Sequence, residues 1–420
     1  MSKLFEKIAS EIGQRGVIGF DRFMELALYC PVYGYYEKET DTVGKHGDFI
    51  TSVSVGSLFG ELLAFQFSEW LETEVQSPKS KVQSRGSWVE GRGGGHSSPT
   101  HHPSSIIHHP PSGSHLPSPK FHLIEAGAHR GDLAQDILSW MQRMRPELYS
   151  NLAYWIIEPS ESRQGWQRKT LRQFDDKVRW ATNLNDLNRA ATVRERPSLP
   201  ESPRGPRGLP EPHPIRGIIF CNELLDAMPV RRFAWDAKER VWFEWGVGMQ
   251  NGRSVWKRMD QCGIEELPVA QKLPDGFTIE LSPAAEAWWT EAASLFERGR
   301  LVAIDYGLSQ DELWIPERRN GTLRAYRQHR WSPDPLNDPG EQDITAHVNF
   351  SRIAHAGVKA GMNTDLLVTQ EKFLTGIAAK TWEAGVQFGN WGAKEKRQFQ
   401  TLTHPEHLGR AFRVLVQNKI

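Results

Sequence analysis

Apolar and polar positions along the chain repeat in a way that predicts strands alternating with helices. Residues 121–124 form a short apolar run that ends at Glu125, and apolar side chains at helical spacing follow over 132–141. Gly127 and Gly131 lie between these segments and bracket a tight turn. A strand, a glycine-bearing turn and a helix predict the first half of a nucleotide-type βαβ unit, whose ligand lies beyond the carboxyl end of the strand.

The same rhythm continues beyond this unit. Further apolar runs predict strands at 152–157, 178–180, 217–221 and 301–304. Because the carboxyl ends of parallel strands share one edge of a sheet, we expect one crevice to collect four acids: Glu125, Glu158, Glu223 and Asp305. A single acid at a strand end is commonly a helix cap, but capping alone does not explain four.

Other segments surround this α/β pattern. Helical periodicity predicts three more helices, at 20–28, 58–70 and 286–300. A polar, glycine-bearing loop at 44–52 suits a ligand clamp. Aromatic and polar residues alternate over 232–259 and predict an antiparallel hairpin lid, and 411–417 suits a last strand of the sheet.

Two segments change composition abruptly. Residues 77–119 are rich in Pro, Ser, Gly and His, residues 194–214 are rich in Pro and Arg, and both predict disordered insertions because apolar residues are too sparse for a core. The histidines lack the fixed spacing of a metal site, so no metal is expected. We expect a helical segment over 1–76 that packs on a core over 120–420, with a hairpin lid and helix inserted at 231–300.

Composition excludes several classes of protein. Lys+Arg and Asp+Glu are balanced at 51 each, so no net field attracts nucleic acid or an anionic membrane. Cys30, Cys221 and Cys262 lie far apart, which disfavours disulfides and zinc and favours a reducing compartment. No apolar run approaches the length of a membrane span, and Glu6 and Glu11 argue against an acid-poor mitochondrial presequence. The prediction is a soluble, cytoplasmic protein.

The acids and the turn together match the chemistry of S-adenosylmethionine. Glu125 and the glycine turn suit the methionine portion, and Glu158 suits the two ribose hydroxyls. The adenine is then expected on the loop after the third strand, which contains Asn185, and Asn222 is expected beside the methyl group. A nicotinamide dinucleotide is disfavoured because the chain lacks G-x-G-x-x-G at this turn.

Several blocks of sequence occur in the order of a known family. They lie at 27–36, 47–52 with 58–61, 222–229, 304–307, 321–326 with His329, and 339–348. The chain resembles the MidA-like methyltransferases, which include the mitochondrial complex I assembly factor that methylates a protein arginine. The resemblance implies a Rossmann-like class I methyltransferase sheet and S-adenosyl-L-methionine as donor. It also implies a protein arginine as acceptor, by analogy on a respiratory-complex subunit.

One residue departs from the family's glycine-rich turn, which usually reads Glu-x-Gly-x-Gly-x-Gly. His129 stands at the middle glycine, where the backbone takes a positive φ. Histidine tolerates that region better than most residues, and its ring either contacts the carboxylate of the ligand or blocks the site. The residues expected to contact the donor are Gly47, Asp48, Thr51, Glu125, Gly127, His129, Gly131, Glu158, Asn185 and Asn222.

The expected acceptor chemistry rests on a second set of acids. Glu223 and Asp226 are three residues apart just past the fourth strand, which suits either a bidentate clamp on a guanidinium or a capping pair. Asp305 is the expected partner or base. Asp343 and His347 would share a helix face and close the pocket if their segment were helical.

These observations predict a methyltransferase that acts on a protein side chain, with arginine as the preferred acceptor. Two alternatives stay open: a non-catalytic assembly or scaffold protein with a degenerate donor site, and a methyltransferase for a small molecule. The oligomeric state is open as well.

Overall fold

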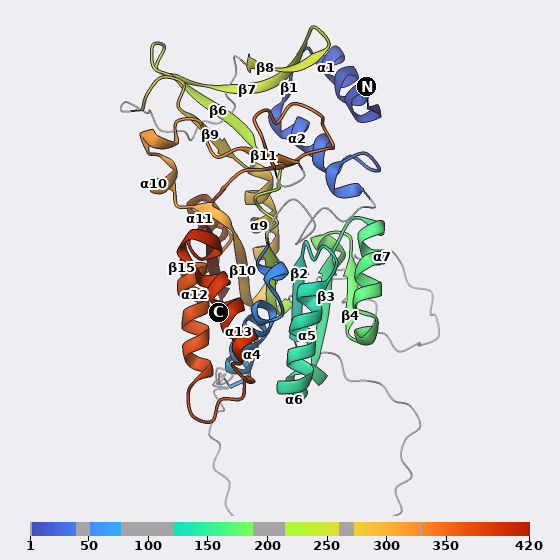
Figure 1. The fold of residues 1–420 in the computed structure, drawn as a ribbon, viewed down its shortest axis with the longest axis vertical. Helices are drawn as coiled ribbons and strands as arrows, with labels where there is room; N and C mark the ends of the chain where they lie inside the picture. The colour runs from blue at the N-terminus through green and yellow to red at the C-terminus, as the bar shows by residue number, and fades with distance from the viewer. Residues whose placement is uncertain (1, 39–50, 77–120, 188–214, 260–272, 328–329) are drawn as a thin grey trace, which may run out of the picture.

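A computed structural model describes residues 2–38, 51–76, 121–187, 215–259, 273–327 and 330–420. At its centre lies an eight-stranded sheet with the order β15-β16-β10-β5-β2-β3-β4, in which β14 also pairs with β10 (Figure 1). The strands are β2 (Phe121–Ala126), β3 (Leu152–Ile157), β4 (Val178–Ala181), β5 (Ile215–Asn222), β10 (Phe296–Leu308), β14 (Val348–Asn349), β15 (Asn363–Thr369) and β16 (Phe412–Lys419).

The path of the chain through this sheet creates a ligand crevice. β2 pairs in parallel with both β3 and β5, and β10 pairs in parallel with β5. The chain therefore enters at β2, moves outward through β3 to β4, and resumes at β5 on the other side of β2. In sheets of this kind the crevice lies where the strand order reverses, which here is between β2 and β5.

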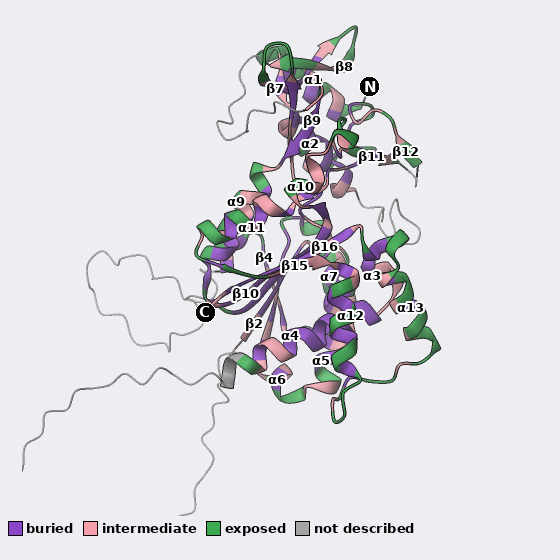
Figure 2. Cartoon of the chain, turned by 90° about the vertical axis from the view of Figure 1, so that its left-hand side faces the viewer, coloured by how far each residue is buried: buried purple, intermediate pink, exposed green. Residues whose placement is uncertain are grey.

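Helices cover both faces of the sheet because successive strand residues project to opposite sides. Ile218 and Phe220 pack against one helical layer, and Ile219 and Cys221 against the other. The first layer contains α4 (Leu58–Gln76), α5 (Asp132–Met144), α12 (Gln370–Thr381) and α13 (Ala393–Thr403), and the second contains α9 (Pro283–Ser294) and α11 (Phe350–Lys359). Figure 2 shows the strands buried between these layers. Full burial of a side chain such as Phe220 contributes about 1.5–3 kcal/mol.

Two smaller sheets lie beyond the upper end of the large sheet in Figure 1. An antiparallel sheet combines β1 (Ile18–Gly19), β6 (Arg231–Asp236), β7 (Val241–Gln250), β8 (Arg253–Met259) and β9 (Thr278–Leu281), and a three-stranded sheet combines β11 (Arg324–Arg327), β12 (Arg330–Ser332) and β13 (Asp343–Thr345). The remaining helical elements are α1 (Lys3–Arg15), α2 (Phe20–Tyr29), η1 (Tyr35–Glu37), α3 (Ser52–Val55), α6 (Pro146–Ser150), α7 (Glu161–Thr170), η2 (Arg172–Phe174), α10 (Gln310–Leu313), η3 (Pro316–Arg318) and η4 (Pro405–Gly409). β1 pairs with β7, so the N-terminal segment supplies an edge strand as well as helices.

The α/β class and the mostly parallel sheet predicted above are confirmed, but three local predictions are wrong. Glu125 does not end its strand, because β2 continues to Ala126. The helix predicted over 286–300 ends at Ser294, since residues 296–300 pair with β5 and begin β10. The segment that follows Asp343 is a strand rather than a helix, because it pairs with β11.

Two further predictions concern the insertions and membrane spans. The proposed insertions at 77–119 and 194–214 lie outside the described residues. Among the helices that the structure describes, none is both long enough and apolar enough to cross a membrane.

Candidate functional site

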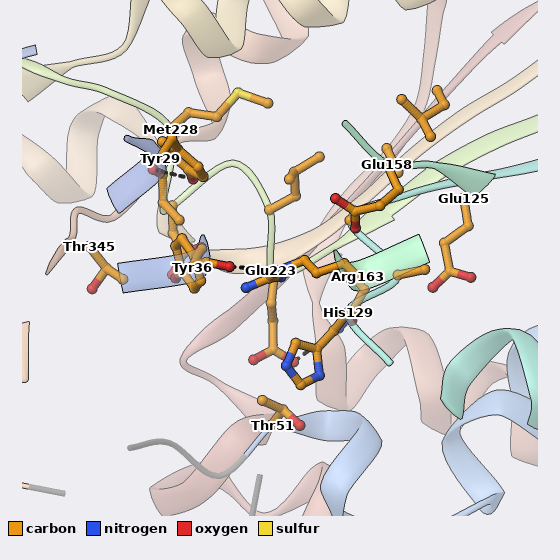
Figure 3. A pocket seen from close by; sticks show the side chains of 18 of the residues that line it. Tyr29, Tyr36, Thr51, Glu125, His129, Glu158, Arg163, Glu223, Met228 and Thr345 are labelled. Carbon is orange, nitrogen blue, oxygen red and sulfur yellow. Dashed lines mark hydrogen bonds between the residues drawn. The ribbon is translucent and has the colours of Figure 1, made fainter. Parts of the chain in front are cut away.

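A cavity of about 930 Å³ opens at the carboxyl ends of the central strands. Its walls come from the ends of β2 to β5, from the N-terminal segment, and from β11 and β13 (Figure 3). Of the acids expected to converge here, Glu125, Glu158 and Glu223 line the cavity and Asp305 does not.

The turn after β2 forms one end of the cavity. Gly127 has a φ of 78° and Gly131, which precedes α5, a φ of 86°. A Cβ added to Gly127 would lie 3.0 Å from Leu224 Cδ1, so a side chain here would be strained in backbone and crowded in space. Within β2, the buried Glu125 accepts a 2.6 Å hydrogen bond from the Tyr154 hydroxyl, and burial raises its pKa to about 7.

His129 occupies the middle position of the turn with a φ of 46°. It therefore adopts the backbone conformation for which a glycine would be favoured. Its carbonyl accepts a 3.0 Å hydrogen bond from Gln167 Nε2, and its ring lies 6.1 Å from the ring of Trp166. Figure 3 shows the imidazole at the cavity wall, so the substitution keeps the turn and adds a side chain to the site.

Glu158, directly after β3, is buried and held in one orientation. The backbone N–H of Ser160 donates to Oε1 at 3.0 Å, and Gln167 Nε2 donates to Oε2 at 3.0 Å. Burial raises its pKa, and the nearby Arg163 guanidinium opposes that rise. Such a fixed acceptor suits a diol.

The loop after β4 contributes a different residue from the one expected. Thr182, Asn183 and Leu184 line the cavity, whereas Asn185 is exposed and does not. Asn183 Oδ1 accepts from the backbone N–H of Asp186 at 3.1 Å and so caps this turn. The loop predicted to hold the adenine therefore borders the cavity, but through residues other than Asn185.

The segment after β5 places two side chains in the wall. Asn222 Nδ2 donates to Glu223 Oε1 at 3.0 Å, and the backbone N–H of Ser52 donates to the same oxygen at 3.1 Å. Asn222 Oδ1 is buried without a hydrogen-bond partner. Glu223 has a positive φ of 53°, and burial raises its pKa to about 8.

Asp226 lines the cavity, while Asp305 lies behind it and holds the turn together. Asp305 Oδ2 accepts from the backbone N–H groups of Leu224 at 3.1 Å, Leu225 at 2.8 Å and Asp226 at 3.4 Å. Burial raises the pKa of Asp226 well above its usual value, and the carboxyl of Asp305 adds to that rise. Asp305 therefore holds the turn that follows Glu223, while its predicted role as partner or base of the acceptor stays a prediction.

The facing wall contains aromatic residues that the predicted set of donor and acceptor residues did not include. Tyr29 and Tyr36 stack with their ring centroids 5.5 Å apart, and the Tyr36 hydroxyl donates to Asp343 Oδ1 at 2.7 Å. Both tyrosines line the cavity, as do Asp343 and His347. The sequence offered one indication that these tyrosines belong to the site, because both lie in the family block at 27–36.

The polar loop expected to clamp the donor is described only in part. Thr51 lines the cavity and caps α3, accepting a 3.0 Å hydrogen bond from the backbone N–H of Ser54. Gly47 and Asp48 lie outside the described residues.

These residues fit S-adenosylmethionine. The cavity has a glycine turn where a Cβ added to Gly127 would crowd Leu224, an oriented carboxylate at Glu158, and an unpartnered buried acceptor at Asn222 Oδ1. The turn and Glu125 suit the amino acid portion, and Glu158 suits the ribose hydroxyls. An unpaired buried acceptor is costly, and a bound ammonium or hydroxyl would remove that cost.

Comparison with known proteins agrees with this geometry. Residues 112–368 match the family described as “Putative S-adenosyl-L-methionine-dependent methyltransferase”. The chain belongs to this family. Its donor is S-adenosylmethionine, and the resemblance to the MidA-like methyltransferases is confirmed.

Relatives and a solved structure extend the match over the chain. “Protein arginine methyltransferase NDUFAF7, mitochondrial” of Danio rerio is 24% identical over 426 residues, covering 97% of this chain and 85% of that protein. The Bos taurus protein of the same name is 36% identical over 358 residues, covering 84% and 68%. A “likely methyl transferase” from Burkholderia thailandensis, crystallised with S-adenosyl-homocysteine, has a TM-score of 0.73 and 26% identity, covering 99% of this chain and 92% of that one.

The cytoplasmic location predicted from the sequence is wrong by this comparison, because the relatives are named mitochondrial. That prediction relied on Glu6 and Glu11. Both acids lie in α1, whose Leu4, Ile8 and Ile12 are buried in the folded protein. Glu6 is exposed and Glu11 pairs with Arg22 at 3.0 Å, so both acids belong to the folded helix and do not decide targeting.

Proposed function

We propose that this protein methylates arginine side chains of other proteins. The observation that carries the proposal is a pair of carboxyls, Glu223 and Asp226, in the cavity wall beside the donor turn. Neither forms an ion pair with a cation in the part of the chain that the structure describes, and burial raises the pKa of both. The names of the relatives, protein arginine methyltransferases, support the same acceptor.

A guanidinium suits this wall for an electrostatic reason. Arginine keeps its charge at any physiological pH, and it pairs with carboxylates through two parallel hydrogen bonds. Asn222 and Ser52 donate to Glu223 Oε1 and thereby fix the orientation of the whole carboxyl group. The second oxygen, Oε2, accepts neither of these two bonds. Entry of a cation favours the ionised forms of Glu223 and Asp226, and the ionised pair then orients the guanidinium.

The wall also offers a destination for the proton that arginine must lose. When bound, S-adenosylmethionine supplies a methyl group on a positively charged sulfur. A guanidinium nitrogen forms the new N–C bond as the C–S bond breaks, and its proton passes to the Glu223 carboxylate. A pKa raised to about 8 by burial places Glu223 in the range of an effective acid–base group.

Labelled methyl transfer tests the proposal. The protein is incubated with S-adenosylmethionine carrying an isotopic methyl group and a mitochondrial protein extract, and the protein fraction is hydrolysed to amino acids. We expect labelled methylarginine with wild type and with Glu61→Gln, a matched change of a partly buried glutamate in α4, and at least a hundredfold less with Glu223→Gln. Label in lysine, or in small molecules alone, would refute arginine as the acceptor.

His129 supports a second candidate, a non-catalytic assembly protein whose donor site is obstructed. Its ring enters the cavity at the turn that should contact the donor. Its φ of 46° weighs against obstruction, because the backbone of the turn is kept. Calorimetry with S-adenosyl-homocysteine decides between the two. Binding by wild type supports the enzyme, and binding only after His129→Gly supports the assembly protein.

A further inference from the structure

The three-stranded sheet leads from the cavity to the protein surface. Asp343 on β13 pairs with Tyr326 on β11, and Tyr326 pairs on its other side with Trp331 on β12. Thr345 pairs with Arg324 in the same way. Directly opposite residues of antiparallel strands project from the same face, and so do residues two apart along one strand. We call this row of five side chains the platform.

Burial decreases along the platform. Asp343 is 4% exposed, Tyr326 and Thr345 are half-buried, Arg324 is exposed, and Trp331 is 61% exposed. The first four line the catalytic cavity. A chain that leaves the cavity over β11 therefore meets polar side chains first and an exposed indole last.

Arg324 joins the cavity to a second hollow. This hollow has a volume of about 430 Å³, and Arg318, Arg324 and Trp331 are among its lining residues. On the opposite face of the small sheet, Ala325 and Ile344 are buried against the N-terminal core. The platform is thus the face on which another molecule can lie.

The sign of the charge changes along this path. The cavity end is acidic, with Glu223, Asp226 and Asp343 in its wall. The outer end carries two arginines, Arg318 and Arg324, and one acid, Glu317, so its charged groups are net basic. The two arginines donate to the carbonyls of Glu312 and Leu323 and form no ion pair within the described residues. The pKa of His347, in the cavity wall, is lowered first by burial and then by the positive charges of these two arginines.

We propose that the platform binds an acidic polypeptide segment next to the methyl-accepting residue. The cationic acceptor enters the acidic end, carboxylates adjacent to it in the sequence meet Arg324 and Arg318, and the segment packs on Trp331. This proposal rests on a protein acceptor and adds the sequence context that the enzyme selects. Tryptophan and arginine are among the residues that contribute most of the binding energy in protein interfaces, and the platform contains one of each.

Fluorescence anisotropy with two labelled peptides tests the platform. Both peptides contain one arginine, flanked by glutamates in the first and by glutamines in the second, and binding is measured with S-adenosyl-homocysteine present. We expect wild type to favour the glutamate peptide by about three- to tenfold at low salt, with a smaller preference at high salt. Arg324→Gln and Trp331→Ala should each remove most of the preference. Arg172→Gln, an exposed arginine on η2, and Trp382→Ala, a tryptophan that is 62% exposed after α12, should keep it.

Several outcomes would overturn the proposal. Equal binding of the two peptides, binding of neither, or an unchanged preference in both platform variants would each refute it. A wild-type dimer that Trp331→Ala dissociates would assign the face to a second copy of the chain instead.

Because anisotropy needs no methyl transfer, the experiment distinguishes the two proposals. A binding preference without methyl transfer would refute only the proposed function, and equal transfer to both peptides would refute only the platform.

Discussion

Replacement of Asp305 should separate positioning from chemistry at the cavity. Asp305 is fully buried and accepts four backbone hydrogen bonds, from Leu224, Leu225, Asp226 and Tyr306. Three of these bonds belong to the turn that follows Glu223. Asp305→Ala leaves those N–H groups without a partner and without access to water.

The size of the effect follows from these bonds. Three of the four measure 3.1 Å or less, and each buried donor left unpaired costs about 1–3 kcal/mol. Part of this cost is offset, because the substitution also removes a buried carboxyl whose pKa burial raises to about 7. We expect Asp305→Ala to lower the free energy of unfolding by about 3 kcal/mol. Asp305→Asn, which keeps one acceptor oxygen, should cost about half as much.

Urea unfolding at neutral pH measures both variants, with an unchanged m-value showing that only stability has changed. Asp236→Ala is the control, since Asp236 also accepts two backbone hydrogen bonds, but at an exposed turn where water can replace them; it additionally loses a surface ion pair with Arg258, which is worth little. The folded Asp305→Asn variant should keep methyl transfer within about tenfold of wild type. A stable Asp305→Asn protein with transfer reduced about a thousandfold would refute the positioning role and make Asp305 the base.

Three further predictions concern the site. The first uses Glu223, whose pKa is raised to about 8: kcat/KM with an arginine peptide should rise with pH up to about 8, because the carboxyl must ionise to hold a guanidinium. Glu223→Gln should abolish this rise, and a flat wild-type profile would contradict the prediction. Gly131→Ala should cost about 1–2 kcal/mol in urea unfolding, because φ is 86° and the new Cβ would lie 3.1 Å from Leu171 Cδ1; an unchanged midpoint would contradict it. Tyr154→Phe removes the hydroxyl that lowers the pKa of Glu125, so less of this carboxyl is ionised at pH 7. Calorimetry should show S-adenosyl-homocysteine binding weakened about threefold or more at pH 7 and less at pH 9. An equal loss at both pH values would point to packing instead.

Periodicity in the sequence predicted six strands of the central sheet, β2 to β5, β10 and β16, but not β14 or β15. The boundaries of β3 were predicted to the residue, because Leu152–Ile157 is an uninterrupted apolar run between polar residues. β10 was predicted too short at both ends, since 301–304 lies inside the strand Phe296–Leu308. Its first residues pair with β5, about 80 positions earlier in the chain, and no local pattern carries that information.

The site shows the same division. Strand-end acids located the crevice, yet the direction of each carboxyl depended on neighbours from other segments. Asp305 turns toward the backbone of the β5 turn, and Glu223 is oriented by Ser52 from the N-terminal part of the chain. The wall formed by Tyr29 and Tyr36 depends on how the N-terminal segment packs against β13, which a local pattern does not contain.

A crystal structure with S-adenosyl-homocysteine and an arginine-containing peptide tests the central claim most directly. We predict the homocysteine portion against the turn at Gly127, the ribose hydroxyls on Glu158, and the guanidinium between the carboxyls of Glu223 and Asp226. A guanidinium held elsewhere, with Glu223 and Asp226 paired only to each other or to protein groups, would contradict this assignment of the acceptor site.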